Sequence, residues 1–289
     1  MSGVEVVFNA QAELAEGPVW DVAAQVLWYV DIFRGEVHRL DPATGCDEFW
    51  SVPAPVGSLA LRARGGLILA LADGVYGWVP GEAPVPITTP ETGMNANRFN
   101  DGRTDRQGRF WVGSLHKAET EPTGRLYRLN PSGDCIAVAD GILAANGTAF
   151  SPDGRRGYHA CSQQGTVWSF TVDPDTGDLS DRRPFLQIAR KEGAPDGAIV
   201  DDDGCYWLAQ PFGWRIVRYD PLGRTDRVVQ MPVEMPTSLA FGGRDGRTLF
   251  ITTARHSLSP EALAIQPLAG AILALDTGMS GPADTPFAG

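Results

Sequence analysis

Three oxygen-bearing side chains stand directly before a glycine at widely separated positions: Glu16, Asn146 and Asp196. Two carboxylates and an amide oxygen, with no Cys or His among them, suit a hard divalent cation such as Ca²⁺, Mg²⁺ or Mn²⁺. Carboxylates gathered at one point repel each other, and a cation neutralises that repulsion. Each Asn-Gly or Asp-Gly pair alone is also an ordinary turn signal. The prediction of a metal site therefore depends on whether the fold brings these three residues together.

A second group of polar residues lies in the segment Asn97-Arg98-Phe99-Asn100-Asp101-Gly102. The Arg98 guanidinium offers five donors, and the Asn100 amide both donates and accepts. This pair suits a ligand with several hydroxyls and a carbonyl or carboxylate. The alternative is that Arg98 forms a structural ion pair with Asp101 or Asp105.

The elements that must position these residues repeat six times along the chain. A short strand rich in aromatic and aliphatic residues recurs every 41 to 49 residues, with these central members: Trp28, Leu69, Trp111, Tyr158, Trp207 and Phe250. A second strand follows and ends in a turn, as in GEVHRLDPATG (35–45), because Pro presets φ and Gly supplies a positive φ. A unit of this length with four short strands is typical of a β-propeller blade. The sequence predicts an all-β, six-bladed β-propeller that forms one domain over residues 1–289.

The ends of the chain predict how the ring closes. The first unit divides into strands at 17–21, 26–31, 36–41 and 46–52. The sixth unit has no obvious fourth strand after 271–276, while Val4–Phe8 is a strand pattern without a blade of its own. We therefore expect Val4–Phe8 to complete the last blade. A pair of β-sandwiches would explain the strands but not their regular spacing.

The repeat places the candidate ligands at equivalent positions. In a propeller, the innermost strand of each blade lines the central channel, and Glu16, Asn100, Asn146 and Asp196 all lie where such a strand begins. Ring closure must bring equivalent positions together around one axis. Glu16, Asn146 and Asp196 are thus expected to converge on one cation, with Arg98 and Asn100 beside it.

Composition narrows the partners. The chain has 24 Lys and Arg against 35 Asp and Glu, a net charge of −11, which argues against nucleic acid and against anionic membranes as partners. The N-terminus has no signal-peptide pattern, and four scattered cysteines without a Cys-x-x-Cys pair fit reduced thiols, so we expect a cytoplasmic protein. No Gly-x-Ser-x-Gly elbow, dinucleotide fingerprint or Walker loop occurs, which argues against a serine hydrolase and against nucleotide binding.

Four segments together carry a family resemblance over nearly the whole chain. These segments are Glu16-Gly17-Pro18-Val19-Trp20, Arg98-Phe99-Asn100-Asp101-Gly102, Asn146-Gly147-Thr148-Ala149 and Pro195-Asp196-Gly197. They resemble the gluconolactonase, regucalcin and luciferin-regenerating-enzyme family of six-bladed propellers, and within it the bacterial sugar lactonases. The resemblance implies hydrolysis of an aldonolactone, either gluconolactone or a pentonolactone such as xylono- or arabinonolactone. It implies that Glu16, Asn146 and Asp196 hold one divalent metal ion, with Ca, Mg, Mn, Zn and Fe left open. It further implies that Arg98 and Asn100 bind the lactone and that Asp196 is the catalytic acid/base.

Two positions depart from the family pattern. Cys161 stands where the family commonly has an Asp, and Glu119 lies only near the position of a Glu that some relatives use. We leave Glu119 outside the predicted site. Three other functions remain open: a metal-dependent esterase or phosphotriesterase, a non-catalytic metal-binding propeller, and a protein-binding scaffold. The sequence also leaves the oligomeric state open.

Overall fold

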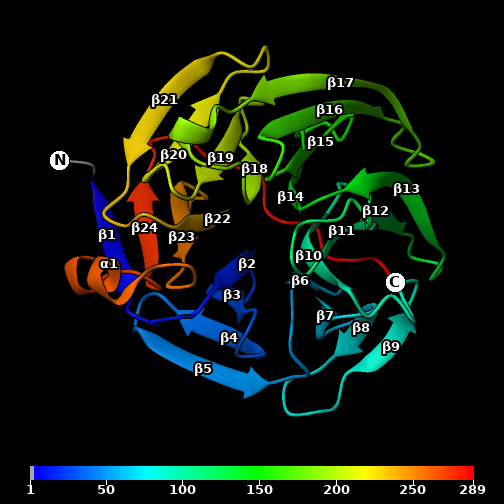
Figure 1. Ribbon diagram of the computed structural model, residues 1–289. Coiled ribbons are helices and arrows are strands. Elements are labelled where there is room, and N and C mark those ends of the chain that lie inside the picture. Colours follow the sequence, from blue (N-terminus) through cyan, green and yellow to red (C-terminus); the bar gives the residue numbers. More distant parts are fainter. Residues whose placement is uncertain (1–2) are drawn as a thin grey trace.

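Six four-stranded antiparallel sheets form a closed ring in the computed structural model, which describes residues 3–289 (Figure 1). The strands of the first three blades, from the axis outward, are β2 (Ala15–Asp21), β3 (Val26–Asp31), β4 (Glu36–Asp41) and β5 (Cys46–Ser51); β6 (Ser58–Leu61), β7 (Leu67–Ala70), β8 (Val75–Trp78) and β9 (Val85–Thr88); β10 (Asn97–Thr104), β11 (Phe110–His116), β12 (Gly124–Leu129) and β13 (Cys135–Ile142). Those of the other three are β14 (Ala145–Phe150), β15 (Arg156–Cys161), β16 (Thr166–Val172) and β17 (Leu179–Gln187); β18 (Ala198–Val200), β19 (Tyr206–Gln210), β20 (Arg215–Tyr219) and β21 (Thr225–Gln230); β22 (Pro236–Gly242), β23 (Thr248–Thr253), β24 (Ile272–Asp276) and β1 (Val4–Phe8). The predicted six-bladed propeller is confirmed.

The last blade takes its outermost strand from the N-terminus, as expected. β1 pairs antiparallel with β24, with Val4 opposite Leu275. The innermost strands also close the ring, because β2 contacts both β6 and β22. Across this junction the Trp20 and Phe250 rings stack with their centroids 5.2 Å apart. The two ends of the chain are therefore joined both by backbone pairing and by aromatic packing.

The hydrophobic core is divided among the six contacts between neighbouring blades. Each contact buries its own cluster of apolar side chains, for example around Trp207 and Ile251 between the fifth and sixth blades. Trp111 and Trp207 are almost wholly buried, and each indole Nε1 donates a 2.9 Å hydrogen bond to a buried carboxylate, Asp105 and Asp201 respectively. These two acidic residues therefore stabilise blade packing, since buried polar groups need partners.

The glycines next to two predicted ligands lie in strand bulges. The pairing register shifts directly after Glu16 in β2 and directly after Asn146 in β14. Gly147 has φ +61°, and a Cβ there would lie 2.6 Å from the Tyr206 hydroxyl oxygen. Only glycine fits this left-handed, crowded position. The Glu16-Gly17 and Asn146-Gly147 pairs are thus part of the inner strands and not hairpin turns.

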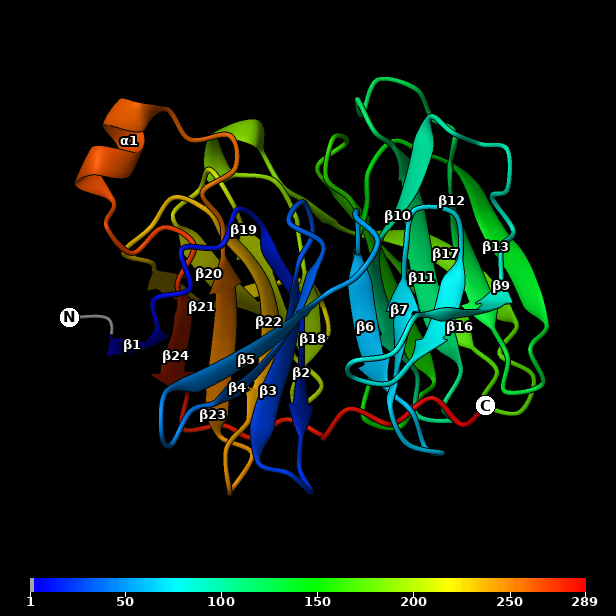
Figure 2. The ribbon, with the colours of Figure 1, turned by 90° about the horizontal axis from the view of Figure 1, so that it is seen from below.

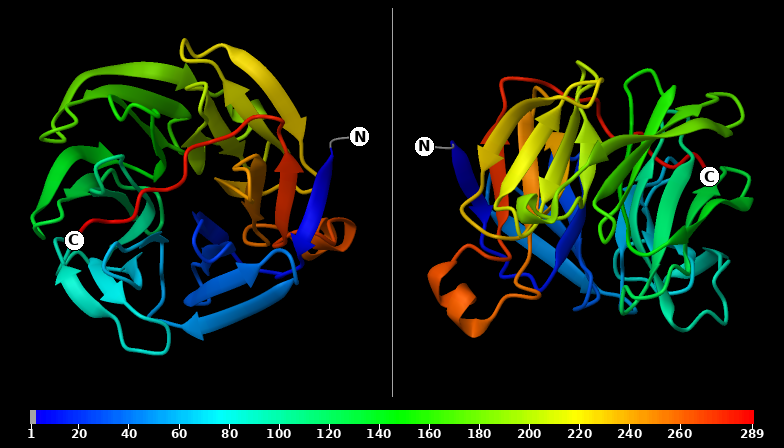
Figure 3. Two further views of the ribbon diagram at one scale, coloured as in Figure 1. Left: turned by 180° about the vertical axis from the view of Figure 1, so that it is seen from behind. Right: turned by 45° about the horizontal axis from the view of Figure 1, so that its top comes forward.

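The two faces of the ring are covered differently (Figures 2 and 3). On one face lie the 3₁₀ turn η1 (Arg190–Glu192) and the single described helix, α1 (Pro260–Ile265). On the other, the C-terminal segment 277–289 crosses from β24 toward the second and third blades, and Phe287 is buried there. Arg103, on the inner strand β10, donates to Asp284 of this segment at 2.6 Å. The sequence did not predict this C-terminal covering.

No helix within residues 3–289 is long and apolar enough to cross a bilayer.

Candidate active site

All five predicted site residues line one cavity of about 390 Å³ near the ring axis. Glu16 lies in β2, Arg98 and Asn100 lie in β10, and Asn146 lies in β14. Asp196 lies two residues before the start of β18. The five predicted residues therefore come from four of the six blades. The fold brings together residues up to 180 positions apart, as the repeat alignment predicted.

A chain of hydrogen bonds connects the third, fourth and fifth blades along the wall of the cavity. Arg98 Nη1 donates to Asn100 Oδ1 at 2.6 Å, and Asn100 Nδ2 donates to Asn146 Oδ1 at 2.9 Å. Asn146 Nδ2 donates to Ser162 Oγ at 2.7 Å, and that hydroxyl donates to the Pro195 carbonyl at 2.7 Å. The chain ends next to Asp196. It fixes both amide groups, because each amide donates through its nitrogen and accepts through its oxygen.

The pKa values of the two acidic residues in the predicted metal site are raised. Burial, followed by the nearby Asp101 carboxylate, raises the pKa of Glu16 to about 8. Burial raises the pKa of Asp196 well above its ordinary value, with Glu16 as the next cause. Glu16 accepts one hydrogen bond, from the Gly17 backbone at 3.0 Å. Like charge on Glu16 thus adds to burial in raising the pKa of Asp196.

The donor set fits a hard divalent cation. Glu16 and Asp196 offer carboxylate oxygens, and Asn146 Oδ1 keeps a second lone pair besides the one that Asn100 uses. No group of three or more His, Cys, Asp or Glu side chains suited to a metal ion occurs within residues 3–289. A cation held here would therefore depend on the Asn146 oxygen and on water to complete its shell. An oxygen-only set of this kind favours Ca²⁺, Mg²⁺ or Mn²⁺.

Arg98 does not form the structural ion pair with Asp101 or Asp105 that was the alternative interpretation. Asp105 pairs with Arg109 instead, and Asp101 accepts a 2.8 Å hydrogen bond from the Thr148 backbone. Arg98 is buried at 7% exposure, and its guanidinium carbon lies 5.7 Å from the centroid of the Phe33 ring. Burial lowers its pKa, which Glu119 and Glu16 oppose. Arg98 is thus a buried cation at the wall of the cavity, beside its carboxylates.

Glu119 and Ser162 are among the cavity residues that lay outside the predicted site. Glu119 lines the cavity, and its Oε2 accepts a 2.5 Å hydrogen bond from Gln163 Nε2. The sequence did not predict this, because Glu119 lies only near the position at which some relatives have a Glu. Ser162 also lines the cavity, and no sequence spacing singled it out. Cys161, which replaces the family's common Asp, is buried between the third and fourth blades and does not line the cavity.

The cavity opens on the face that carries η1 and α1. Its rim includes residues from the turns that follow β11, β15, β19 and β23, among them Lys117, Gln163, Phe212 and His256. The C-terminal segment contacts the opposite ends of the blades: the Phe287 backbone nitrogen, for example, donates to the Leu61 carbonyl at 2.7 Å. A small molecule therefore has its entrance on the η1 and α1 face.

Comparisons with known proteins agree with this architecture. A family model described as "SMP-30/Gluconolactonase/LRE-like region" matches residues 14–255. The chain is 38% identical over 288 residues to a 6-deoxy-6-sulfogluconolactonase from Pseudomonas putida, with 99% of each chain covered. It is 33% identical over 296 residues to regucalcin from Homo sapiens, covering 99% of this chain and 98% of regucalcin.

The solved structures lead to the same group. The crystal structure of a calcium-binding protein, regucalcin, from Agrobacterium tumefaciens matches with a TM-score of 0.94 at 26% identity, covering 98% of this chain and 96% of that one. The family match covers most of the ring, and the relatives match from end to end. The chain therefore belongs to the SMP-30/gluconolactonase/LRE family of six-bladed propellers.

Proposed function

We propose that this protein is a metal-dependent sugar lactonase that hydrolyses an aldonolactone to the aldonic acid. The candidate substrates are gluconolactone and pentonolactones such as xylono- or arabinonolactone. The relative from Pseudomonas putida is named for a 6-sulfonated gluconolactone, so 6-substituted gluconolactones join these candidates. The single observation that carries the proposal is the convergence of Glu16, Asn146 and Asp196 with Arg98 and Asn100 in one cavity.

In this proposal Glu16, Asn146 and Asp196 hold one divalent cation. When bound, the cation supplies positive charge that polarises the lactone carbonyl and stabilises negative charge on its oxygen. The cation also removes the repulsion between Glu16 and Asp196, whose pKa values are raised in its absence. The same carboxylates that repel each other would thus contribute to cation binding.

Asp196 is the proposed acid/base. Its carboxylate accepts a proton from the attacking water as the water oxygen bonds to the carbonyl carbon. The bond from that carbon to the ring oxygen then breaks, and the proton passes to the ring oxygen, which becomes the free hydroxyl of the aldonic acid. One water is consumed and no other reactant is required. A correctly placed general base of this kind contributes about 10²- to 10⁴-fold to the rate.

Arg98 and Asn100 are the proposed substrate-binding residues. Arg98 would donate from its Nε and Nη2, since its described hydrogen bonds use only Nη1. Asn100 would accept from a lactone hydroxyl through the second lone pair of its Oδ1, because its Nδ2 already donates to Ala145 and Asn146. The Asn100–Asn146 hydrogen bond couples the sugar-binding side of the cavity to the cation-binding side. Glu119, a further acceptor on the wall, adds to the groups available for hydroxyls.

A substrate panel tests the proposal. Initial rates would be measured by acid release with a pH indicator for gluconolactone, xylonolactone, arabinonolactone, phenyl acetate and a phosphotriester, each with Ca²⁺, Mg²⁺ and Mn²⁺. We expect turnover of at least one aldonolactone that exceeds turnover of both other esters. Faster turnover of the phenyl ester or phosphotriester would favour the general esterase, and binding without any turnover would favour a non-catalytic propeller.

A further inference from the structure

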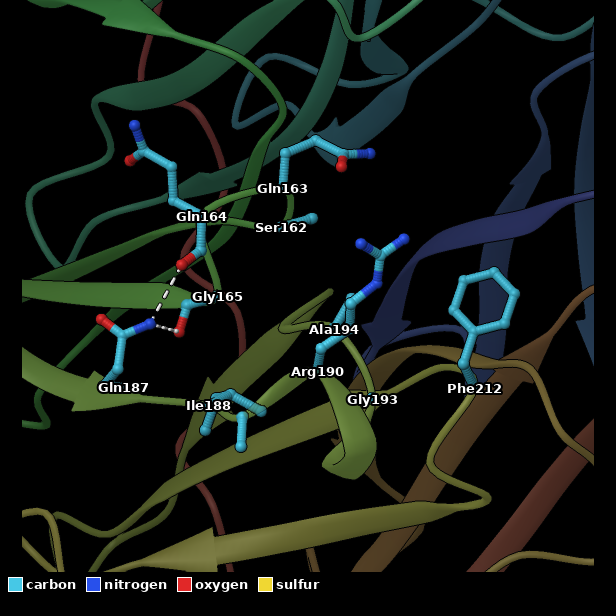
Figure 4. A pocket seen from close by; sticks show the side chains of 11 residues that line it. Ser162, Gln163, Gln164, Gly165, Gln187, Ile188, Arg190, Gly193, Ala194 and Phe212 are labelled. Carbon is cyan, nitrogen blue, oxygen red and sulfur yellow. Dashed lines mark hydrogen bonds between the residues drawn. The ribbon is translucent and has the colours of Figure 1, made fainter.

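A second and larger cavity, of about 760 Å³, adjoins the catalytic cavity (Figure 4). Four residues line both cavities: Ser162, Gln163, Ala194 and Phe212. The remaining walls come from the turn after β15, the end of β17 and the segment that contains η1. We call this space the Arg190 chamber, after the one charged residue in its described lining. The four shared residues form the boundary between the Arg190 chamber and the catalytic cavity.

The charges of the two cavities are opposite. The catalytic cavity is lined by three carboxylates, from Glu16, Glu119 and Asp196, against two cations, Arg98 and Lys117, so its charged side chains sum to −1. The Arg190 chamber has no Asp or Glu in its described lining, and Arg190 is its one cation. The charge of the chamber is thus opposite in sign to the net charge of the whole chain, which is −11. Such a pocket favours a negatively charged group.

The Arg190 guanidinium is available for a ligand. Within the described chain it makes no ion pair and no side-chain hydrogen bond, whereas nearby Arg215 pairs with Glu192 at 3.3 Å. Figure 4 shows the Arg190 side chain extending between Gln163 and Phe212, which are two of the residues at the junction with the catalytic cavity. A planar guanidinium in this position offers paired donors that match the oxygens of an oxyanion.

The amides around Arg190 are partly fixed. Gln187 Nε2 donates to the Gln164 and Gly165 carbonyls at 3.0 and 3.2 Å, which holds one wall of the chamber in place. Gln163 Nε2 donates to Glu119, so its amide links the two cavities. The Gln164 side chain has no hydrogen-bond partner within residues 3–289 and lines the chamber. Neutral amides of this kind can donate to an oxyanion without adding charge repulsion.

We propose that the Arg190 chamber binds an oxyanion substituent on the lactone substrate, at the end of the sugar remote from the lactone carbonyl. The substituent is a sulfonate, a phosphate or a carboxylate, and Arg190 is its counter-ion. This inference rests on the proposed lactonase function and names the substrate class of the same site. An unsubstituted monosaccharide lactone would not extend into the chamber, which would then contain water.

The test compares charged and neutral lactones in wild type, Arg190→Ala and Arg190→Lys. The charged substrates are gluconolactones that carry a phosphate or a sulfonate at C6, and a lactone that carries a carboxylate at C6; the neutral ones are gluconolactone and a disaccharide aldonolactone. We expect Arg190→Ala to lower kcat/KM about 10- to 100-fold for at least one charged lactone and less than about twofold for gluconolactone. Arg190→Lys should recover part of the loss, because it keeps the charge but not the paired donors.

The control variant is Arg244→Ala, since Arg244 is exposed in the turn between β22 and β23 and lines neither cavity. It should leave every kcat/KM unchanged. The charged lactone whose kcat/KM falls most in Arg190→Ala identifies the anion that the chamber prefers. A second readout is salt: kcat/KM for the charged lactone should fall with ionic strength in wild type and less so in Arg190→Ala.

Three results would overturn the inference. One is an equal loss for charged and neutral lactones in Arg190→Ala, and another is no loss for any charged lactone. The third is a preference for the disaccharide lactone that Arg190→Ala does not change. Each of these leaves the lactonase function intact. Absence of hydrolysis for every lactone would instead overturn the proposed function, and this inference with it.

Discussion

Asn100 Nδ2 donates a 2.9 Å hydrogen bond to Asn146 Oδ1 across the junction of the third and fourth blades. This bond joins a proposed substrate-binding residue to a proposed cation ligand. The amide of Asn146 is held from its other side by Ser162, which also donates to the Pro195 carbonyl next to Asp196. This hydrogen-bond chain therefore fixes the Asn146 amide and extends to the residue before Asp196.

Ser162→Ala should weaken cation binding without unfolding the protein. The change leaves the Asn146 amide nitrogen and the Pro195 carbonyl without their described partner. Residues that support metal ligands in this way typically contribute about 10- to 100-fold to metal affinity. We expect a loss of that size in the cation concentration that half-restores activity. Ser132→Ala, an exposed serine in a turn, is the control, and an unchanged affinity in Ser162→Ala would argue against a positioning role.

Asp196→Asn should separate activity from stability. We expect kcat to fall about 10²-fold or more, because the proposed base is lost. The cation-free protein should become more stable to heat or equally stable, since Asn removes a carboxylate that repels Glu16. Asp140→Asn, on an exposed position of β13, should change neither quantity. Full lactonase activity in Asp196→Asn with cation present would contradict the proposed role of Asp196.

The stability of the cation-free protein should depend on pH through Glu16. Its pKa is about 8 in the folded chain against an ordinary 4.5, so between these values the folded state binds more protons than the unfolded state. The free energy of unfolding should therefore decrease as pH rises from about 4.5 to 8, by at most about 1.4 kcal/mol per pH unit. Urea unfolding of wild type and Glu16→Gln across this range measures the difference. The same pH dependence in both proteins would contradict the role of Glu16 in it.

The affinity of the protein for the cation should also depend on pH. A cation must displace the protons that Glu16 and Asp196 hold, so its apparent affinity should rise with pH toward about 8. Calorimetry in two buffers of different ionisation enthalpy would count the released protons. Affinity that does not change between pH 6 and pH 8 would separate these carboxylates from cation binding.

Phe287→Ala should destabilise the ring from the face opposite the cavity. Phe287 is 1% exposed and packs among apolar residues of the second and third blades. A large-to-small change at such a position costs about 3–5 kcal/mol, which urea unfolding would measure. Leu222→Ala, at a position 74% exposed, should cost less than about 0.5 kcal/mol. A loss below about 1 kcal/mol in Phe287→Ala would mean that the C-terminal segment contributes little to stability.

Much of the fold could be predicted because it is periodic. The spacing of Trp28 and its equivalents located every blade, and three of the four strands expected in the first unit lie within one residue of β3, β4 and β5. β2 begins two residues earlier than expected because Ala15 and Glu16 already pair with β3 before the bulge. The unpaired pattern at Val4–Phe8 correctly predicted how the ring closes.

The parts that escaped prediction lack a repeating pattern. Residues 277–289 carry no strand signal, so the burial of Phe287 depends on contacts with blades far away in sequence. Ser162 acts on the Pro195 carbonyl, 33 residues further along, and only the fold brings them together. The Arg190 chamber likewise depends on the path of a connecting segment between blades. Local sequence patterns do not encode such long-range placements.

The most direct test of the account is lactone hydrolysis during removal and return of the cation. Purified protein would be treated with a chelator, desalted, checked by circular dichroism, and assayed with the best aldonolactone before and after addition of Ca²⁺, Mg²⁺ or Mn²⁺. We predict that chelation lowers the rate about 100-fold or more and that at least one cation restores it. The same cation at the same concentration should not restore Glu16→Gln. Full activity in the chelated and still folded protein would contradict the central claim.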